Sequence, residues 1–348
     1  MPQTNRQGRN GSELTMREVA ERAGVALSSV SRVLNNHPDV SNSMRSRVLA
    51  AVSELNYEPN LIASSLRRGS TMTVGFIVAD ISNPLFAEFS KGAATELDLA
   101  GYTMVLANSE FKRERDAQLA RLFRWRRVDG LIVSLADQEY PETIAELQRL
   151  EAPIVLFDRD APKLPQASTV TADHAGGIRR ATDHLLDLGH SRIAMITGPS
   201  SLRPTQERVR GFSNAYRARG SRYPADLLRT GSFDAAFGEA ATSDMLLRQS
   251  PPTAIISGSN QLLVGVLRTL HRMSLRPGRD IALVSCDDVP LAELHHPPIT
   301  IVHRDTINMG AVAAQLLLER IRDVDAPPRL ASVRTELLVR DSTFPITT

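Results

Sequence analysis

Short polar side chains recur at the ends of the apolar segments that resemble strands. Asp158 ends one such segment, and Asp287 and Asp288 end another. Carboxylates and amides suit bidentate hydrogen bonds to vicinal hydroxyls, and aromatic rings suit the apolar face of a sugar. Because ligands of open α/β sheets bind beyond the carboxyl ends of the strands, the sequence predicts a small-molecule site there. The candidate residues for this site are Phe86, Ser134, Asp158, Arg208, Phe233, Asn260 and Asp287.

Each candidate also has a purely structural interpretation when it is taken alone. An Asp after a strand is often the N-cap of the next helix, and this interpretation is slightly favoured for Asp80 and Asp158. An aromatic candidate could belong to the core, and Arg208 could be a solvated helix charge. Two adjacent caps are unnecessary, so the pair Asp287-Asp288 favours a binding site.

Signals of enzymatic chemistry are weak. The sequence contains no G-x-G-x-x-G, G-x-x-x-x-G-K, H-E-x-x-H or G-x-S-x-G motif. The single cysteine, Cys286, ends an apolar segment and is interpreted as an inert thiol. His295-His296 precedes two prolines, which favours a loop over a metal site. We therefore expect no cofactor, no metal and no catalysis. An α/β enzyme fused to the separate N-terminal head described below is the less favoured alternative.

These candidates need a scaffold, and the chain after Thr71 supplies an alternation of strands and helices. This pattern predicts parallel sheets with helices on both faces. About 280 residues exceed the needs of one doubly wound sheet, so we expect two sheets with a cleft between them. Strands are expected at Val74–Ala79, Tyr102–Ala107, Gly130–Ser134, Pro153–Phe157, Ile193–Thr197, Ala254–Ser257 and Ile281–Cys286. Helices are expected at Phe86–Ala100, Arg113–Trp125, Pro141–Leu150, Gly176–Leu188, Gln206–Arg219, Ala235–Arg248, Asn260–Met273 and Met309–Arg322.

The segment before this scaffold predicts a small all-α head. An amphipathic helix is expected over Met16–Ala23, and a second one over Leu27–Leu34. Gly24 separates them and accepts a left-handed turn without steric cost. A helix, a glycine turn and a second helix with a small polar face form the helix-turn-helix pattern, whose second helix enters the major groove. A third helix is expected after Ser41, which is a good N-cap.

Composition sets broad limits on the class of protein. The 348 residues allow two or three domains, and the formal net charge is +2. Residues 1–68 hold nine Arg against six acidic residues, a balance that permits DNA binding. No apolar run reaches the roughly 18 residues of a membrane span. Residues 1–13 are polar and are interpreted as a disordered leader, not a secretory signal. We expect a cytoplasmic protein without membrane contact.

Over about 14–343 the sequence resembles the lactose-repressor (LacI/GalR-type) family of bacterial transcription regulators. Beyond the head, the motifs that carry the resemblance are ELNYEPN, ISNPLFAE, RVDGLIV, HLLDLGHSRIAMITGP, ERVRGF, CDD followed by HPPIT, and LLVRDST. The resemblance implies a helix-turn-helix head, a hinge helix and a two-subdomain core like that of periplasmic sugar-binding proteins. The expected boundaries are a head at 14–60, a hinge helix at 61–70, a core N-subdomain at 71–169 and 302–324, and an effector-binding and dimerisation C-subdomain at 170–301 and 325–348.

The resemblance also implies roles in DNA binding. Leu27, Ser28 and Arg32 match positions of the recognition helix that face bases, and an Arg fork suits guanine O6 and N7. Leu66 matches a hinge leucine that wedges into the minor groove and kinks the site. Phosphate contacts or positioning roles are implied for Thr15, Asn35, Ser41 and Tyr57, and places in the hinge for Asn60 and Ala63. In the core the family pattern matches Phe86, Asp158, Arg208, Phe233 and Asp287, in agreement with the positions after the strands.

Three departures from the family pattern affect these expectations. Ala26 stands where the family has Ser or Thr at the N-cap of the recognition helix, Ser259-Asn260 replaces Asn-Asp, and Ser285-Cys286 replaces Gly-aromatic. The binding pocket is therefore altered, and no named sugar is carried over. We expect a dimeric, allosteric repressor that binds pseudo-palindromic double-stranded operator DNA. Its effector is expected to be sugar-like, or else a nucleobase; the alternative is a sugar-binding protein without a regulatory role.

Overall fold

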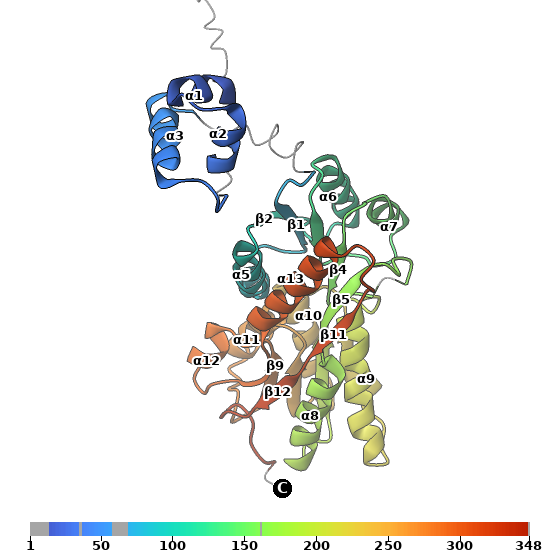
Figure 1. Ribbon diagram of the computed structural model, residues 1–348. Helices are drawn as coiled ribbons and strands as arrows, with labels where there is room; N and C mark the ends of the chain where they lie inside the picture. The colour runs from blue at the N-terminus through green and yellow to red at the C-terminus, as the bar shows by residue number, and fades with distance from the viewer. Residues whose placement is uncertain (1–13, 35–36, 58–68, 161, 347–348) are drawn as a thin grey trace, which may run out of the picture. The chain divides into compact units, whose positions relative to one another are not determined.

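The computed structural model describes residues 14–34, 37–57, 69–160 and 162–346, and the chain divides into two units between Thr71 and Met72 (Figure 1). The expected leader at 1–13 and residues 61–68 of the expected hinge helix lie outside the described residues. In the described part of the chain, no helix combines the length and apolar character that a membrane crossing requires.

The N-terminal unit is a three-helix domain with a small apolar core. Its helices are α1 (Met16–Ala23), α2 (Leu27–Leu34) and α3 (Asn42–Glu54), and the predicted bounds of the first two are confirmed. The core consists of small side chains from all three helices, with Val19, Val30 and Val48 almost fully buried. Such short helices are marginal alone, so their stability depends on this mutual packing.

Local contacts fix the ends of these short helices. Gly24 adopts a left-handed φ of 62° after α1, as the turn requires. The Arg47 guanidinium of α3 donates to the Ala23 and Gly24 carbonyl oxygens at 2.7 Å each. Ser41 accepts a hydrogen bond from the Met44 N–H, which confirms it as the N-cap of α3. The turn between α1 and α2 is therefore stabilised by a side chain of α3.

The larger unit contains two six-stranded sheets, as the pattern of strands and helices predicted. The first sheet has the order β11-β5-β4-β3-β1-β2, and the second has the order β12-β10-β9-β8-β6-β7. Neighbouring strands are parallel except β10 and β12, which are antiparallel. The strands of the first sheet are β1 (Thr73–Val78), β2 (Thr103–Asn108), β3 (Gly130–Val133), β4 (Ile154–Phe157), β5 (Ser168–Ala172) and β11 (Leu330–Val333). Those of the second are β6 (Ile193–Thr197), β7 (Leu228–Thr230), β8 (Ala254–Ser257), β9 (Ala282–Cys286), β10 (Thr300–Arg304) and β12 (Thr335–Leu338).

Helices cover both faces of each sheet (Figure 1). The first sheet packs against α5 (Pro84–Leu99), α13 (Thr306–Arg322), α6 (Arg113–Trp125) and α7 (Pro141–Gln148). The second packs against α8 (His174–Asp187), α9 (Arg203–Ala218), α10 (Ala235–Leu246), α11 (Asn260–Arg272) and α12 (Pro290–Leu294). Helices α5 and α13 approach so closely that a Cβ at Gly310 would lie 2.0 Å from the Phe89 carbonyl oxygen.

The chain passes between the two sheets three times, after β5, after β10 and after β11. The first lobe therefore comprises residues 72–172 and 306–333, and the second lobe comprises 174–304 and 335–346. This corrects the expected boundaries, which divided β5 and β10 and assigned β11 to the second lobe. The physical reason is that these strands are short and contain polar residues, and that β11 pairs with β5 about 160 residues earlier, so no local pattern marks them.

Candidate functional site

A cavity lies between the two lobes, beyond the carboxyl ends of strands from both sheets. It holds about 440 Å³ of unfilled space, including its open mouth. Six of the seven predicted ligand residues line it: Phe86, Ser134, Asp158, Arg208, Phe233 and Asp287. Asn260 does not line this cavity; its amide donates to the Asn83 Oδ1 at 2.8 Å. The other lining residues are Asn83, Leu85, Phe111, Phe157, Arg159, Pro204, Ser259 and Arg304.

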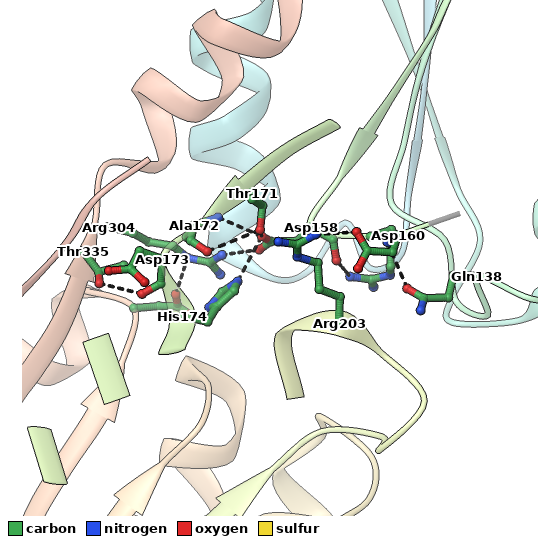
Figure 2. A network of polar contacts seen from close by, with 12 residues as sticks. Gln138, Asp158, Asp160, Thr171, Ala172, Asp173, His174, Arg203, Arg304 and Thr335 are labelled. Atoms are coloured by element: carbon green, nitrogen blue, oxygen red, sulfur yellow. Dashed lines mark hydrogen bonds and ion pairs between the residues drawn. The ribbon is translucent and has the colours of Figure 1, made fainter. Parts of the chain in front are cut away.

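The carboxylate of Asp158 is the centre of a buried polar network, which Figure 2 shows. Its Oδ1 accepts from the Ala172 N–H at 3.2 Å and lies 3.0 Å from the His174 Nε2. The Thr171 hydroxyl donates to the same oxygen at 3.2 Å. Thr171 and Ala172 end β5, which pairs with β4, and His174 begins α8. The network therefore lies where the chain first passes between the lobes.

Arg304 connects this carboxylate to a second one. Its Nη1 donates to the Asp158 Oδ2, and its Nε donates to the Asp287 Oδ1 at 2.8 Å. Burial opposes ionisation of Asp158, but the adjacent His174 and Arg304 side chains and their hydrogen bonds hold its pKa well below the usual value. Arg304 ends β10 in the second lobe and Asp158 follows β4 in the first, so this ion pair spans the two lobes.

The slightly favoured interpretation of Asp80 and Asp158 as helix N-caps is wrong. Asp158 accepts the network bonds described above, and Asp80 accepts from the Ser82 N–H at 2.9 Å and from the Gln261 amide at 2.7 Å. Asn83 caps α5 instead, with its Oδ1 3.0 Å from the Leu85 nitrogen. Asp158 and Asp287 both have left-handed backbones, with φ of 52° and 70°. Such strain is commonly found at functional sites.

Arg208 differs from the other charged residues of the cavity because two of its donor atoms are unused. It is 2% exposed, and its Nε and Nη1 atoms have no hydrogen-bond partner among the described residues. Its guanidinium carbon lies 6.0 Å from the centre of the Phe233 ring, at the limit of a cation–π contact. A buried guanidinium with free donors is costly without a ligand, because its desolvation is uncompensated.

Further side-chain contacts join the two lobes, one of them between aromatic rings that line the cavity. Phe233 of the second lobe lies 6.3 Å from Phe111 of the first lobe, measured between ring centres. Two further contacts join the lobes: Asp80 with Gln261, described above, and Asp160 with Arg203 (Figure 2). The lobes are thus held together around the cavity by side chains, in addition to the three chain crossings.

Cys286 lies at the end of β9, within hydrogen-bonding reach of Arg208. Burial raises the pKa of its thiol to about 11, so the group is protonated at neutral pH. This agrees with the interpretation of an inert thiol. Among the described residues, no three or more His, Cys, Asp or Glu side chains are grouped so as to hold a metal ion.

The head presents part of the predicted DNA-reading set on its surface. Leu27 is 48% exposed, and Ser28 and Arg32 are also exposed on α2. Thr15 is exposed at the start of α1, where the Glu18 carboxylate accepts from its N–H at 2.6 Å. Tyr57 is buried in the core of the head, a location that suits positioning more than contact. Asn35, Asn60, Ala63 and Leu66 lie outside the described residues.

Sequence reasoning did not identify four contributors to the cavity and its mouth. Arg304 was missed because the run before it was not predicted as a strand. Arg159 follows the same predicted strand as Asp158, but only the fold shows that it lines the cavity. Asn83 had a signal, since Pro84 at the first helical position marks the residue before it as a cap. Phe111 had none, because it stands in a loop and faces Phe233 only through the fold.

Two family models match the chain. The model for bacterial regulatory proteins of the lacI family matches residues 15–60, and the model for a periplasmic binding protein-like domain matches residues 182–343. The "HTH-type transcriptional repressor PurR" of Photobacterium profundum is 30% identical, over 94% of this chain and 98% of the relative. The "Ribose operon repressor" of Escherichia coli is 32% identical, over 93% of this chain and 96% of the relative.

Two solved structures extend these similarities to three dimensions. A complex of the transcriptional regulator CelR with cellobiose has a TM-score of 0.73 and 32% identity, and covers 95% of this chain and 100% of that one. The lac repressor dimer bound to operator and the anti-inducer ONPF has a TM-score of 0.83 and 27% identity, and covers 96% of this chain and 100% of that one.

Proposed function

The chain belongs to the lacI family of bacterial regulatory proteins, and we propose that it is a repressor whose operator affinity is set by a small molecule bound between its lobes. As a member of this family it is a DNA-binding transcriptional regulator. The observation that carries the proposal is the cavity: six of the predicted site residues, contributed by both lobes, line one space. A ligand that touches both lobes can favour one arrangement of them over another.

DNA binding is assigned to the helix-turn-helix head. We propose that Arg32 and Ser28 of α2 contact base edges, and that Leu27 packs on a thymine methyl group. The exposure of these three side chains supports this role. Asn35, Asn60, Ala63 and Leu66 are proposed for DNA contact on the family pattern alone, with Leu66 as the residue that inserts into the minor groove.

We propose that the protein acts as a homodimer in the cytoplasm, with each head on one half of a pseudo-palindromic operator. The lac repressor, which this chain resembles, has been solved as a dimer on its operator. The edge strand β2 leaves Val105 44% exposed, which suits a surface that a second copy covers.

Effector binding and DNA binding must influence each other equally. If the effector changes operator affinity by a given factor, operator changes effector affinity by the same factor, with a coupling of typically about 1–3 kcal/mol. The similarity to CelR, solved with cellobiose, and to the ribose operon repressor supports a sugar-like effector for this chain. A nucleobase is the second option, supported by the similarity to the PurR repressor.

The proposal is tested by measuring the affinity of the full chain for fragments of its own genome in a fluorescence anisotropy titration. We expect a salt-sensitive preference for a small number of fragments, and a shift in affinity when the effector is added. No preference for any fragment, with or without metabolites, would refute the regulatory function. A sugar-binding protein without a regulatory role would bind ligand but show no such preference.

The same preparations separate a regulator from an enzyme. We propose that the cavity performs no chemistry, because its carboxylates pair with Arg304 and the buried thiol of Cys286, outside its lining, is protonated. Incubation with sugars and nucleobases, followed by chromatography, should recover them unchanged. Turnover that is lost in a cavity variant would refute this part of the proposal.

A further inference from the structure

Five ionisable side chains line the cavity between the lobes, and their charges do not balance. They are the carboxylates of Asp158 and Asp287 and the guanidinium groups of Arg159, Arg208 and Arg304. Both carboxylates pair with Arg304, through its Nη1 and its Nε. One guanidinium therefore serves two acids, and two further guanidinium groups have no carboxylate from the lining.

Asp158 has little capacity left for a ligand. Its Oδ1 already meets the Thr171 hydroxyl, the Ala172 N–H and the His174 ring, and its Oδ2 meets Arg304. A sugar hydroxyl that donated to this carboxylate would have to displace one of these protein partners. The acid that the sequence predicted as a hydroxyl acceptor is thus mainly a structural anion.

Arg208 has the opposite character, because its donors are free. Its Nε and Nη1 are buried and unpartnered, and its contact with the Cys286 thiol is with a weak acceptor. A guanidinium always carries its charge and presents its donors in a planar fork. The free Nε and Nη1 donate from different edges of the guanidinium, as those of Arg304 do, so each needs its own acceptor. A charged oxygen is the strongest acceptor for such a donor.

Arg159 adds a second positive charge that protein carboxylates do not balance directly. Its Nε donates to the Leu135 carbonyl oxygen, and its Nη1 donates to that of Asp158 at 2.8 Å. Burial lowers its pKa to about 10. The charges of Asp158 and Asp116 oppose this effect, and Asp116, whose pKa burial raises to about 6, is mostly ionised at neutral pH. Asp116 does not line the cavity, so within the lining itself Arg159 remains a positive charge without a carboxylate of its own.

We propose that the effector carries an anionic oxygen group, a carboxylate or a phosphate ester, which binds the free donors of Arg208. This inference rests on the proposed function, because it assumes that the cavity is the effector site. The three guanidinium groups and two carboxylates of the lining leave one positive charge, which a singly charged anionic ligand would neutralise. The rings of Phe86 and Phe233, in the same lining, suit the apolar face of the rest of the ligand. Acidic sugars and sugar phosphates are the classes that combine these features.

The test compares ligands that share a carbon skeleton and differ in charge. For glucose, galactose and ribose in turn, the neutral sugar, its aldonate, its uronate where one exists, and its phosphate ester are titrated calorimetrically into the full chain. We expect at least one anionic ligand to bind about 10- to 100-fold more tightly than its neutral parent. Comparison of the aldonate or uronate with the phosphate ester identifies which anion is recognised.

Two variants assign the effect to Arg208. Arg208→Gln should remove the preference for the anionic ligand, and Arg208→Lys should retain part of it because the charge remains. Arg210→Gln is the matched control on the same helix, because Arg210 is exposed and pairs with Glu207. It should leave all affinities unchanged. Circular dichroism spectra and melting temperatures should show that all three variants are folded.

The outcomes separate this inference from the proposed function. A neutral sugar that binds as tightly as its acid and phosphate overturns the inference; if that sugar also shifts operator affinity, the regulatory function stands. No binding by any acid or phosphate in the series also overturns the inference. A preference for the anion that survives in Arg208→Gln overturns the assignment to Arg208.

Discussion

The ion triad of Asp158, Arg304 and Asp287 gives a prediction about stability that can be worked out from the structure. The side chains are 6%, 6% and 8% exposed, so Arg304→Met leaves two carboxylates buried without a guanidinium. Removing one partner of a buried pair costs about 3–5 kcal/mol, because the remaining charge is uncompensated. We expect the free energy of unfolding at pH 7.5 to fall by roughly this amount in urea titrations.

The pH dependence of this loss provides a sharper test. In the wild type the pKa of Asp158 is depressed, so its ionised form contributes stability above the unfolded pKa of about 4, and this is lost as pH falls through the folded pKa. In Arg304→Met burial dominates, and Asp158 protonates more easily. The deficit of the variant should therefore be largest near pH 8 and should shrink towards pH 5.

Two further proteins control this experiment. The triple variant Asp158→Asn, Asp287→Asn, Arg304→Met has no buried charge at these positions and should recover most of the lost stability. Arg340→Met removes a more exposed pair with Asp288 and should cost only about 1 kcal/mol. A deficit below about 1 kcal/mol for Arg304→Met, or one that is constant between pH 5 and 8, would refute the reasoning.

Three other changes have defined expectations. Ala26→Ser supplies the missing N-cap hydroxyl of α2 and should raise the stability of the head by about 0.5–2 kcal/mol, measured by circular dichroism on heating. Burial raises the pKa of Asp116 to about 6, so the free energy of unfolding decreases as pH rises from about 4 through 6. Asp116→Asn should therefore stabilise the protein by about 1–3 kcal/mol at pH 8 and not at pH 4. An equal gain at both pH values would contradict this expectation. Gly310→Ala places a Cβ 2.0 Å from the Phe89 carbonyl oxygen and should lower stability by about 1–3 kcal/mol in calorimetry, and an unchanged melting temperature would count against the close packing of α5 and α13.

Local patterns were sufficient for the elements that bury one continuous apolar face. The bounds of α1, α2, β6 and β8 agree with the predicted ones, because a helical stripe or a short apolar run is visible without knowledge of its partners. The rule that ligands bind beyond the ends of parallel strands then brought Ser134, Asp158 and Asp287 to one cavity.

Non-local pairing explains what the sequence did not predict. Strand β10 pairs with β9 and with β12, and β11 pairs with β5, which lies about 160 residues earlier in the chain. Because these strands are short and partly polar, they lack a local signature, and Arg304 at the end of β10 was lost with them. The role of Asp158 changed for the same reason, since its partner Arg304 is distant in sequence.

The first lobe also has a consequence for how the protein is made. Its core contains α13, whose residues Met309, Ala313 and Leu317 pack with Phe89 of α5, yet residues 174–304 of the other lobe are synthesised before α13. When the first five strands of this sheet have left the ribosome, the face that α13 will cover is therefore still exposed. The nascent chain must stay unaggregated for the roughly ten or more seconds that translation of the intervening segment takes. Demand for a chaperone should accordingly peak in the middle of synthesis and end once α13 has emerged.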